Sequence, residues 1–311
     1  MTIDKILALG QTAMELGLIN SLTVLSLFLS YSMLNVCDLS TDGCYTLGAA
    51  VGALVAIAGY PWLSLPAAML AGMISGFVTA TLQTRMGVQS LLAGIVVNTA
   101  LYSVNMALTG NKATLSMNKT TTIFSMAKNL LKDTPLAGQS TLIVMLIVVA
   151  LVIVFLCFFL KTKLGLAIRA TGSNADMVRS SSINPTFTTT VGLCISNAFT
   201  GLSGCLMAQQ AKSFDINMGS GMVTVALASL LIGGVFVAKH KPIPLRAVGT
   251  VLGAVIFRIV YALALRFNMP AFMLKAVSSI IVVLAISGPY LRKQLPLMIR
   301  RWKASREGRS A

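Results

Sequence analysis

The sequence predicts an all-α, polytopic membrane protein with about nine transmembrane helices. Three observations predict this class: 56% of the 311 residues are hydrophobic, only 10% are charged, and the mean hydropathy is +0.85. A soluble domain usually carries about 25% charged residues. A membrane-spanning helix needs about 20 largely apolar residues, and the chain holds a series of such stretches, some of them short or interrupted.

In chain order, we expect spans at 14–36, 43–60, 64–84, 89–109, 139–160, 187–209, 222–238, 247–266 and 273–290. Residues 1–13 precede the first span and are expected to lie as an interfacial segment outside the membrane. The spans 43–60 and 222–238 are short and rich in glycine, so each is open to being a broken or re-entrant helix. Residues 14–290 then form one transmembrane domain.

The basic residues set the orientation. The net charge is +16, from 24 Lys and Arg against 8 Asp and Glu. With nine spans, fifteen basic residues fall on the side of Arg85, 161–186, 239–246 and the tail 291–311, and eight on the other side. The richer side is expected to be cytoplasmic, which puts the N-terminus outside and the C-terminus inside.

This orientation makes 110–138 an outer loop and 161–186 a cytoplasmic segment. The tail 291–311 becomes a basic cytoplasmic segment that meets anionic membrane lipids. The positive charge therefore records topology, and no nucleic-acid partner is expected.

Glycine pairs at four-residue spacing predict close helix contacts. Each pair places two small residues on one helix face, where a neighbouring backbone is able to approach. The pairs are Gly48 and Gly52, Gly72 and Gly76, and Gly249 and Gly253.

No motif for metal binding or enzyme chemistry is found. Five cysteines are present, of which Cys37 and Cys44 are near enough in sequence to be bridged, but no second Cys or His cluster accompanies them. We expect no metal and no cofactor. The chain lacks a phosphate-binding loop and the G-x-S-x-G, H-E-x-x-H and C-x-x-C motifs, so any energy input comes from an ion gradient or a partner.

Polar residues inside spans are the candidate path residues. Arg258 lies near the middle of 247–266, where a cation costs several kcal/mol unless it is paired or hydrated. It either lines a hydrated path or serves as a structural arginine. Asn98 and Asn197 also interrupt apolar spans, and their amides bond either to other helices or to a substrate. We place Arg258, Asn98 and Asn197 on the path.

The turn between the first two spans carries Asp38 and Asp42. Asp38 or Ser40 is expected to cap the following helix, and Gly43 permits a sharp bend. Local capping is sufficient to explain these residues.

The segment 161–186 is too long for a tight turn. Ser173 or Asn174 is expected to cap a short helix that ends before Pro185. This helix carries the apolar Met177 and Val178, which favours docking on another protein, with an ordinary loop as the alternative.

Several motifs then resemble one known family. They are R-A-x-G-x-N at 169–174, G-L-x-x-S-N-x-x-x-x-L-S-G at 192–204, M-G-x-G at 218–221, A-S-x-x-I-G at 228–233 and D-L-S with L-G-A at 38–49. The pattern is similar to permeases of the branched-chain amino acid/monosaccharide class of ABC importers, over nearly the whole chain. The region 249–285 looks closest to tryptophan/tyrosine (aromatic amino acid) permeases. One departure is Gly234, where the aromatic-type members commonly carry an acidic residue.

The resemblance implies partners. A permease of this class forms a homodimer above two ATPase subunits, which bind ATP, and receives substrate from an extracellular binding protein, often a lipoprotein. Residues 14–290 are then the permease domain. The short cytoplasmic helix becomes the coupling helix that enters the ATPase. The coupling residues expected on this basis are Ser173, Asn174, Asp176, Met177, Val178 and Arg179.

Other readings stay open. The substrate is most simply an amino acid whose carboxylate meets Arg258, with a sugar or nucleoside as the alternative. An ion-coupled secondary carrier is disfavoured because the spans hold almost no acidic residues. A membrane scaffold without transport activity has no need for Asn98, Asn197 and Arg258 inside its spans.

Overall fold

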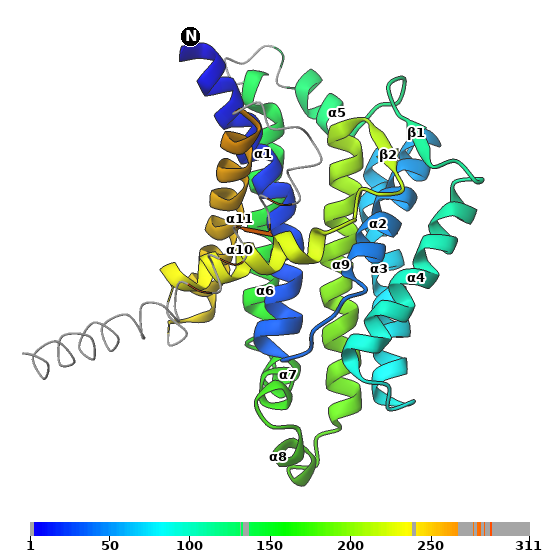
Figure 1. Ribbon diagram of the computed structural model, residues 1–311, viewed down its shortest axis with the longest axis vertical. Coiled ribbons are helices and arrows are strands. Elements are labelled where there is room, and N and C mark those ends of the chain that lie inside the picture. Colours follow the sequence, from blue (N-terminus) through cyan, green and yellow to red (C-terminus); the bar gives the residue numbers. More distant parts are fainter. Residues whose placement is uncertain are drawn as a thin grey trace, which may run out of the picture.

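A computed structural model describes residues 3–130, 132, 137–237 and 241–266, together with positions 276, 279, 280, 283 and 287. The described chain is a bundle of helices (Figure 1). The α-helices are α1 (Ile3–Leu27), α2 (Thr41–Ile57), α3 (Pro61–Thr84), α4 (Ser90–Leu108), α5 (Ile123–Leu130), α6 (Ser140–Phe159), α7 (Lys163–Ser173), α8 (Ala175–Ser180), α9 (Pro185–Ala211), α10 (Met222–Phe236) and α11 (Ile243–Arg266). A π-helical turn, η1 (Phe28–Met33), extends α1, and a 3-10 turn, η2 (Ala137–Gln139), precedes α6.

Six described helices are long and apolar enough to cross a membrane. They are Gly10–Met33, Pro61–Thr84, Ser90–Leu108, Ser140–Phe159, Pro185–Ala211 and Ile243–Ala264. α2 and α10 are apolar but shorter, at 17 and 15 residues, and whether these two segments are broken or re-entrant stays a prediction. The expected ninth span, 273–290, and the tail 291–311 lie outside the described residues, apart from the five isolated positions.

α9 is the centre of the bundle and packs against α1, α2 and α3. The predicted close approaches are present, because a Cβ atom on Gly48, Gly72 or Gly76 would overlap the backbone of α9. A Cβ atom on Gly253 would overlap the backbone of α10, and one on Gly249 would overlap the side chain of Val237, just after α10. These small residues let the helices touch backbone to backbone.

Hydroxyl groups join α9 to α1 within the apolar core. Ser26 Oγ lies 2.8 Å from both Ser196 Oγ and Thr200 Oγ1, and Ser203 Oγ donates to the Ile19 carbonyl at 2.7 Å. All of these hydroxyls are buried, so the hydrogen bonds satisfy groups that water does not reach.

α2 and α10 both begin inside the bundle. After η1 the chain turns back without helical structure over residues 35–40 and enters α2 partway along the bundle, and after β2 a second non-helical segment leads to α10 (Figure 1). α10 lies across the direction of the longer helices (Figure 1). Two helix N-termini are thereby placed in the interior.

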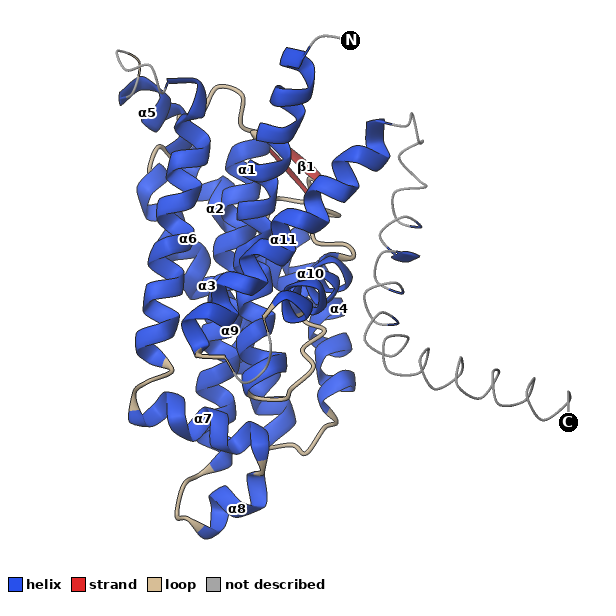
Figure 2. Cartoon of the chain, turned by 90° about the vertical axis from the view of Figure 1, so that its left-hand side faces the viewer, coloured by secondary structure: helices blue, strands red, loops and turns tan. Residues whose placement is uncertain are grey.

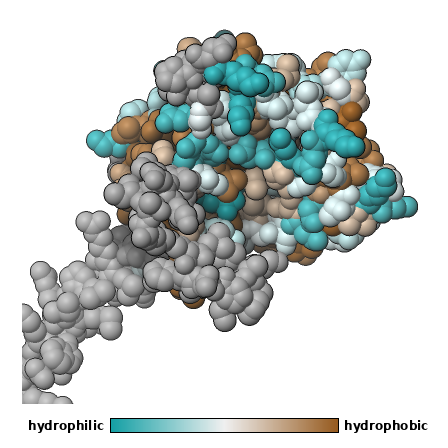
Figure 3. Space-filling model, turned by 90° about the horizontal axis from the view of Figure 1, so that it is seen from above, coloured by the Kyte–Doolittle hydropathy of each residue, from teal (hydrophilic) through white to brown (hydrophobic). Residues whose placement is uncertain are grey.

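The two ends of the bundle differ in structure. α7 and α8 form one end, and α5 lies at the other (Figure 2). Near α5, strand β1 (Thr114–Ser116) pairs antiparallel with β2 (Ser213–Asp215), with Leu115 opposite Phe214. Seen from this second end, hydrophilic side chains cover much of the face and hydrophobic ones appear at its margin (Figure 3).

Two regions depart from the expected layout. α1 is one continuous helix from Ile3, so the expected boundary between 1–13 and the first span falls inside it. Residues 163–173, expected as part of a loop, form the helix α7. α7 packs against the end of η1, where Gly172 lies against the backbone of Met33 and Leu34.

Candidate functional site

Asp42 joins the N-termini of α2 and α10. It lies in the first turn of α2, and its Oδ2 and Oδ1 accept hydrogen bonds from the backbone N–H groups of Gly221 at 2.9 Å and Val223 at 2.8 Å. One turn further along α2, Thr46 Oγ1 accepts from the Gly219 N–H at 3.2 Å. Asp42 thus supplies an N-terminal cap to α10 from another helix.

The glycines of the M-G-x-G motif make this junction possible. Gly219 lies so close to the Asp42 carbonyl that no side chain fits, and Gly221 has a φ of +83°, which favours glycine. The motif therefore has a local structural reason at both glycine positions.

Arg258 lies in α11 and faces Asn20 of α1. With the Asn20 amide oxygen turned toward the guanidinium, it accepts hydrogen bonds from Arg258 Nε at 3.0 Å and Nη2 at 3.1 Å. The guanidinium also lies 5.2 Å from the Tyr261 ring centroid, and it interacts electrostatically with the buried Tyr45. No carboxylate among the described residues lies within 4.0 Å of Arg258. Its positive charge is therefore held by neutral groups.

A cavity of about 410 Å³ lies beside Arg258. Its walls come from α1, α11, the start of α10 and one residue of the 273–290 region. The lining residues are Asn20, Ser220, Gly221, Met222, Thr224, Val225, Phe257, Arg258, Tyr261 and Ser279. The cavity combines one cation, several hydroxyl and amide groups, and apolar and aromatic surface.

Asn197 lies elsewhere, in a buried hydrogen-bond cluster with Asp38. Its Nδ2 donates to Asp38 Oδ2 at 2.9 Å, while Asp38 Oδ1 accepts from both the backbone N–H and the hydroxyl of Ser40 at 2.8 and 2.6 Å. Asp38 and Asn197 are 1% and 0% exposed, so this cluster fixes the non-helical turn before α2 against α9. Ser40 is the N-cap residue of α2, and Asp38 acts on the cap rather than on the helix directly.

Asn98, in α4, lies beside the first turn of α2. Its Oδ1 is beside Gly43, where a Cβ atom would meet it at 2.7 Å, and two turns further along α4 Asn105 Nδ2 donates to the Gly43 carbonyl at 3.3 Å. Of the three expected path residues, Asn98 and Asn197 therefore lie beside the start of α2. Only Arg258 lines the cavity.

The short helix α8 is present at the tip of the bundle (Figure 1). Of the two expected caps, Asn174 is the one used: its Oδ1 accepts from the N–H groups of Asp176 and Met177, both at 3.0 Å, whereas Ser173 ends α7. Met177 is 64% exposed and Val178 is 2% exposed, so α8 presents one apolar side chain outward and anchors itself with the other. Asp176 and Arg179 are also exposed.

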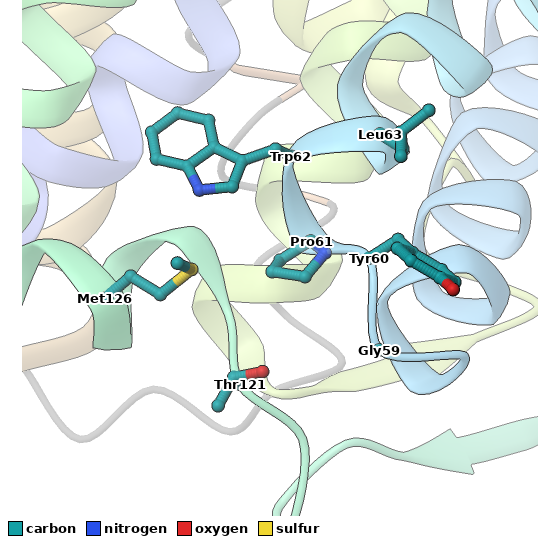
Figure 4. Close-up of a pocket in the computed structure, with 7 residues that line it drawn as sticks. All are labelled: Gly59, Tyr60, Pro61, Trp62, Leu63, Thr121 and Met126. Carbon is teal, nitrogen blue, oxygen red and sulfur yellow. The ribbon is translucent and has the colours of Figure 1, made fainter.

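A second cavity, of about 310 Å³, lies between the α2–α3 turn and α5 (Figure 4). Trp62 and Met126 extend to one side of Pro61, and Leu63 extends to the other (Figure 4). Tyr60, Trp62 and Leu63 are each about 60% exposed, which is typical of side chains at a membrane–water interface. The described residues contain no group of three or more His, Cys, Asp or Glu side chains that could hold a metal ion.

Two residues of the site are not among the expected path residues. Asn20 is an amide inside an apolar span, the same signal that identifies Asn98 and Asn197. Asp42 was expected to act in a local turn, whereas its carboxylate binds a segment 179 positions away.

Buried polar contacts inside an apolar helical bundle, with a cavity beside an intramembrane cation, are typical of a membrane transport protein. A family model described as branched-chain amino acid transport system / permease component matches residues 12–286. The chain belongs to this family of ABC-type transport permeases and is a multi-pass protein of the bacterial cell membrane.

Individual relatives agree with this family. The chain is 31% identical to a tyrosine transport system permease protein of Clostridioides difficile (strain R20291), over 88% of each chain. It is 33% identical to an uncharacterized protein of Rickettsia prowazekii (strain Madrid E), over 71% of this chain and 75% of the relative. It is 25% identical to a ribose import permease protein of Haemophilus influenzae, over 70% of this chain and 66% of the relative. No solved structure matches the chain.

Proposed function

We propose that this chain forms the substrate path of an ATP-driven importer for an amino acid. The observation that carries the proposal is the cavity of about 410 Å³ beside Arg258. Arg258 has neutral hydrogen-bond partners, so its charge is free to attract a carboxylate. The first turn of α10 lines the same cavity, but the Asp42 carboxylate already caps its N-terminus, so Arg258 is the group left to attract the substrate anion.

An aromatic amino acid fits the composition of this cavity. Phe257, Tyr261 and Met222 provide apolar and aromatic surface close to Arg258. The tyrosine permease among the relatives supports this substrate class. Gly234, the expected acidic position, lies on the exposed side of α10 and is not among the residues that line the cavity.

Uptake by cells that contain the complete transport system tests the role of Arg258. Arg258→Ala is expected to reduce amino acid uptake at least about tenfold, since a charge-assisted contact is lost, and Arg258→Lys is expected to retain part of it. Assembly with the ATPase should survive in both variants. Normal uptake in Arg258→Ala removes Arg258 from the path.

A sugar is the second candidate, because the ribose permease relative covers most of the chain. Ser220 and Thr224 would then be the groups that bind hydroxyls in the cavity. A thermal-shift screen of the cognate binding protein against aromatic amino acids, sugars and nucleosides separates the two classes. Stabilisation by an amino acid alone supports the first proposal, and stabilisation by a sugar or nucleoside alone contradicts it.

α8 is proposed as the coupling helix that docks on an ATPase subunit, which binds the ATP. Exposed Met177 is the side chain available to enter a groove, with Asp176 and Arg179 beside it. Met177→Asp is expected to abolish uptake and weaken co-purification of the ATPase. If both survive this change, the docking assignment is wrong.

The topology and the remaining partners are also part of the proposal. We propose nine spans with the N-terminus outside, the C-terminus inside and α8 in the cytoplasm. A C-terminal reporter that is active only outside the cytoplasm should be silent. We further propose a homodimer of this chain that receives substrate from an extracellular lipoprotein. Cross-linking of two differently tagged copies tests the dimer.

A further inference from the structure

A second arginine, Arg246, is held in a fixed position at the α7 end of the bundle. It lies in the first turn of α11, and its Nη2 donates to Ser32 Oγ at 2.9 Å. Its guanidinium carbon lies 5.3 Å from the centroid of the buried Phe28 ring. The hydrogen bond and the ring contact orient the guanidinium plane while its other N–H groups stay available.

Arg169 places a second positive charge beside the first. α7 packs on the end of η1 through Gly172, which lies against the Met33 backbone next to Ser32. Arg169, one turn earlier on α7, is exposed and interacts electrostatically with Arg246. Among the described residues, no Asp or Glu carboxylate lies within 4.0 Å of either arginine. Two positive charges therefore lie on neighbouring elements at this end of the bundle, because α7 packs against the turn that carries Ser32, and an anion near both would be stabilised.

The surroundings indicate which anion. Leu245 and Val248, on either side of Arg246 along α11, are 46% and 42% exposed, and Tyr31, next to Ser32, is 43% exposed. Leu166, one turn before Arg169, is 52% exposed. Charged groups at the end of spanning helices with exposed apolar side chains around them match a molecule with an anionic head and a hydrocarbon tail. A free anion or an acidic protein surface would leave these exposed apolar side chains without a partner.

We propose that Arg246, Arg169 and Ser32 bind the phosphate of an anionic phospholipid from the leaflet at the α7 end, with Leu245, Val248 and Tyr31 against its acyl chains. Arginine suits this role because its planar fork of donors binds two phosphate oxygens at once. The site is separate from the cavity beside Arg258 and does not depend on the identity of the transported substrate.

Native mass spectrometry of the full chain tests the proposal. The purified protein is incubated with phosphatidylglycerol or with phosphatidylcholine, and the lipid-bound fraction is measured. Wild type is expected to retain phosphatidylglycerol preferentially, and the double variant Arg246→Gln/Arg169→Gln to lose that preference about tenfold. Arg85→Gln is the matched control, because Arg85 is an exposed arginine at the end of α3. Its preference should stay unchanged.

The remaining outcomes distinguish the sources of the anion. Equal phosphatidylglycerol retention by wild type and the double variant overturns the proposal. Thermal stabilisation of wild type by inorganic phosphate to the same extent as by phosphatidylglycerol assigns the site to a free anion and overturns the lipid assignment. Loss of ATPase co-purification without any loss of lipid makes the arginines a protein-docking site. If the double variant does not fold, Ser32→Ala and Arg169→Gln are measured singly. An unchanged preference for phosphatidylglycerol in both single variants also overturns the proposal.

Discussion

The Asp42 carboxylate holds the backbone N–H of Gly221 at 2.9 Å and so fastens the start of α10 to the start of α2. Both helices begin partway along the bundle, and the first N–H groups of a helix have no partner within the helix itself. A single side chain satisfies two of these groups in α10, with Val223 N–H as the second. The wall of the cavity beside Arg258 is therefore built from a turn whose position is set by α2.

Removal of this cap is expected to destabilise the protein. Asp42→Ala leaves two interior N–H groups without their acceptor, and loss of an N-cap costs about 0.5–2 kcal/mol. Asp42→Asn keeps one acceptor oxygen and should lose less. The measurement is thermal unfolding in detergent.

Asp215→Ala is the matched control for this prediction. Asp215 Oδ1 accepts from the Asn217 N–H at 2.7 Å in an exposed turn. This variant should change the free energy of unfolding by less than about 0.5 kcal/mol. Equal changes in the free energy of unfolding for Asp42→Ala and Asp215→Ala would contradict a stabilising role of the α10 cap.

Two adjacent glycines of α10 are expected to respond to alanine in opposite directions. A Cβ atom on Gly233 would overlap the Gly249 backbone of α11, so Gly233→Ala should destabilise the protein by about 1–3 kcal/mol. Gly234 has no atom within 4 Å of its Cβ position, so Gly234→Ala should stabilise α10 by about 0.5–1 kcal/mol. Each variant's thermal midpoint is compared with that of wild type. Loss of stability in both variants would contradict this α10–α11 contact.

A carboxylate at position 20 is expected to compete with the substrate. Asn20→Asp places a negative charge within hydrogen-bonding distance of Arg258 and pairs with it. If a substrate carboxylate binds Arg258, uptake should fall about tenfold or more while thermal stability is kept or raised. Asn20→Ser, which stays neutral, is the control and should retain more uptake. Full uptake by Asn20→Asp contradicts a carboxylate at Arg258.

The caps of α8 and α9 give a matched test of coupling. Asn174 and Asn184 make the same type of side-chain cap, each accepting a backbone N–H at 3.0 Å. Asn174→Ala loosens α8 and should lower transport per ATP hydrolysed. Asn184→Ala removes a comparable cap, about 1 kcal/mol of stability, but does not touch α8 directly. Substrate uptake and ATP hydrolysis are measured together in the complete system, and equal losses of uptake per ATP in both variants contradict a coupling role for α8.

Hydropathy predicts most of the helices, because a stretch of about 20 apolar residues has few alternatives to a spanning helix. The segments predicted at 43–60 and 222–238 correspond to helices of 17 and 15 residues, which are shorter than the six long apolar helices. The helix α7 was missed, since its packing depends on a few small or apolar residues, such as Gly165, Ile168 and Gly172, within a polar segment. That contact surface is evident only when η1 is placed against it.

The site was less predictable than the fold. Arg258 stands out because a cation inside a span is rare, and the cavity beside it agrees with that signal. Its contact with Asn20, and that of Asp42 with Gly221, join residues from opposite parts of the chain, and no local pattern reports such pairing. Asn197 was chosen for the same reason as Arg258, but its amide binds Asp38 in a cluster away from the cavity.

The contacts at the start of α2 also restrict how the transporter is able to move. The Asp42 carboxylate accepts a hydrogen bond from the start of α10, and the Gly43 carbonyl accepts one from Asn105 of α4. The Cys44 thiol donates to the Asn197 carbonyl of α9. Rotation of α2 about its own axis would break all three contacts together. We therefore expect α2 and the start of α10 to travel as one rigid unit when the transporter changes conformation.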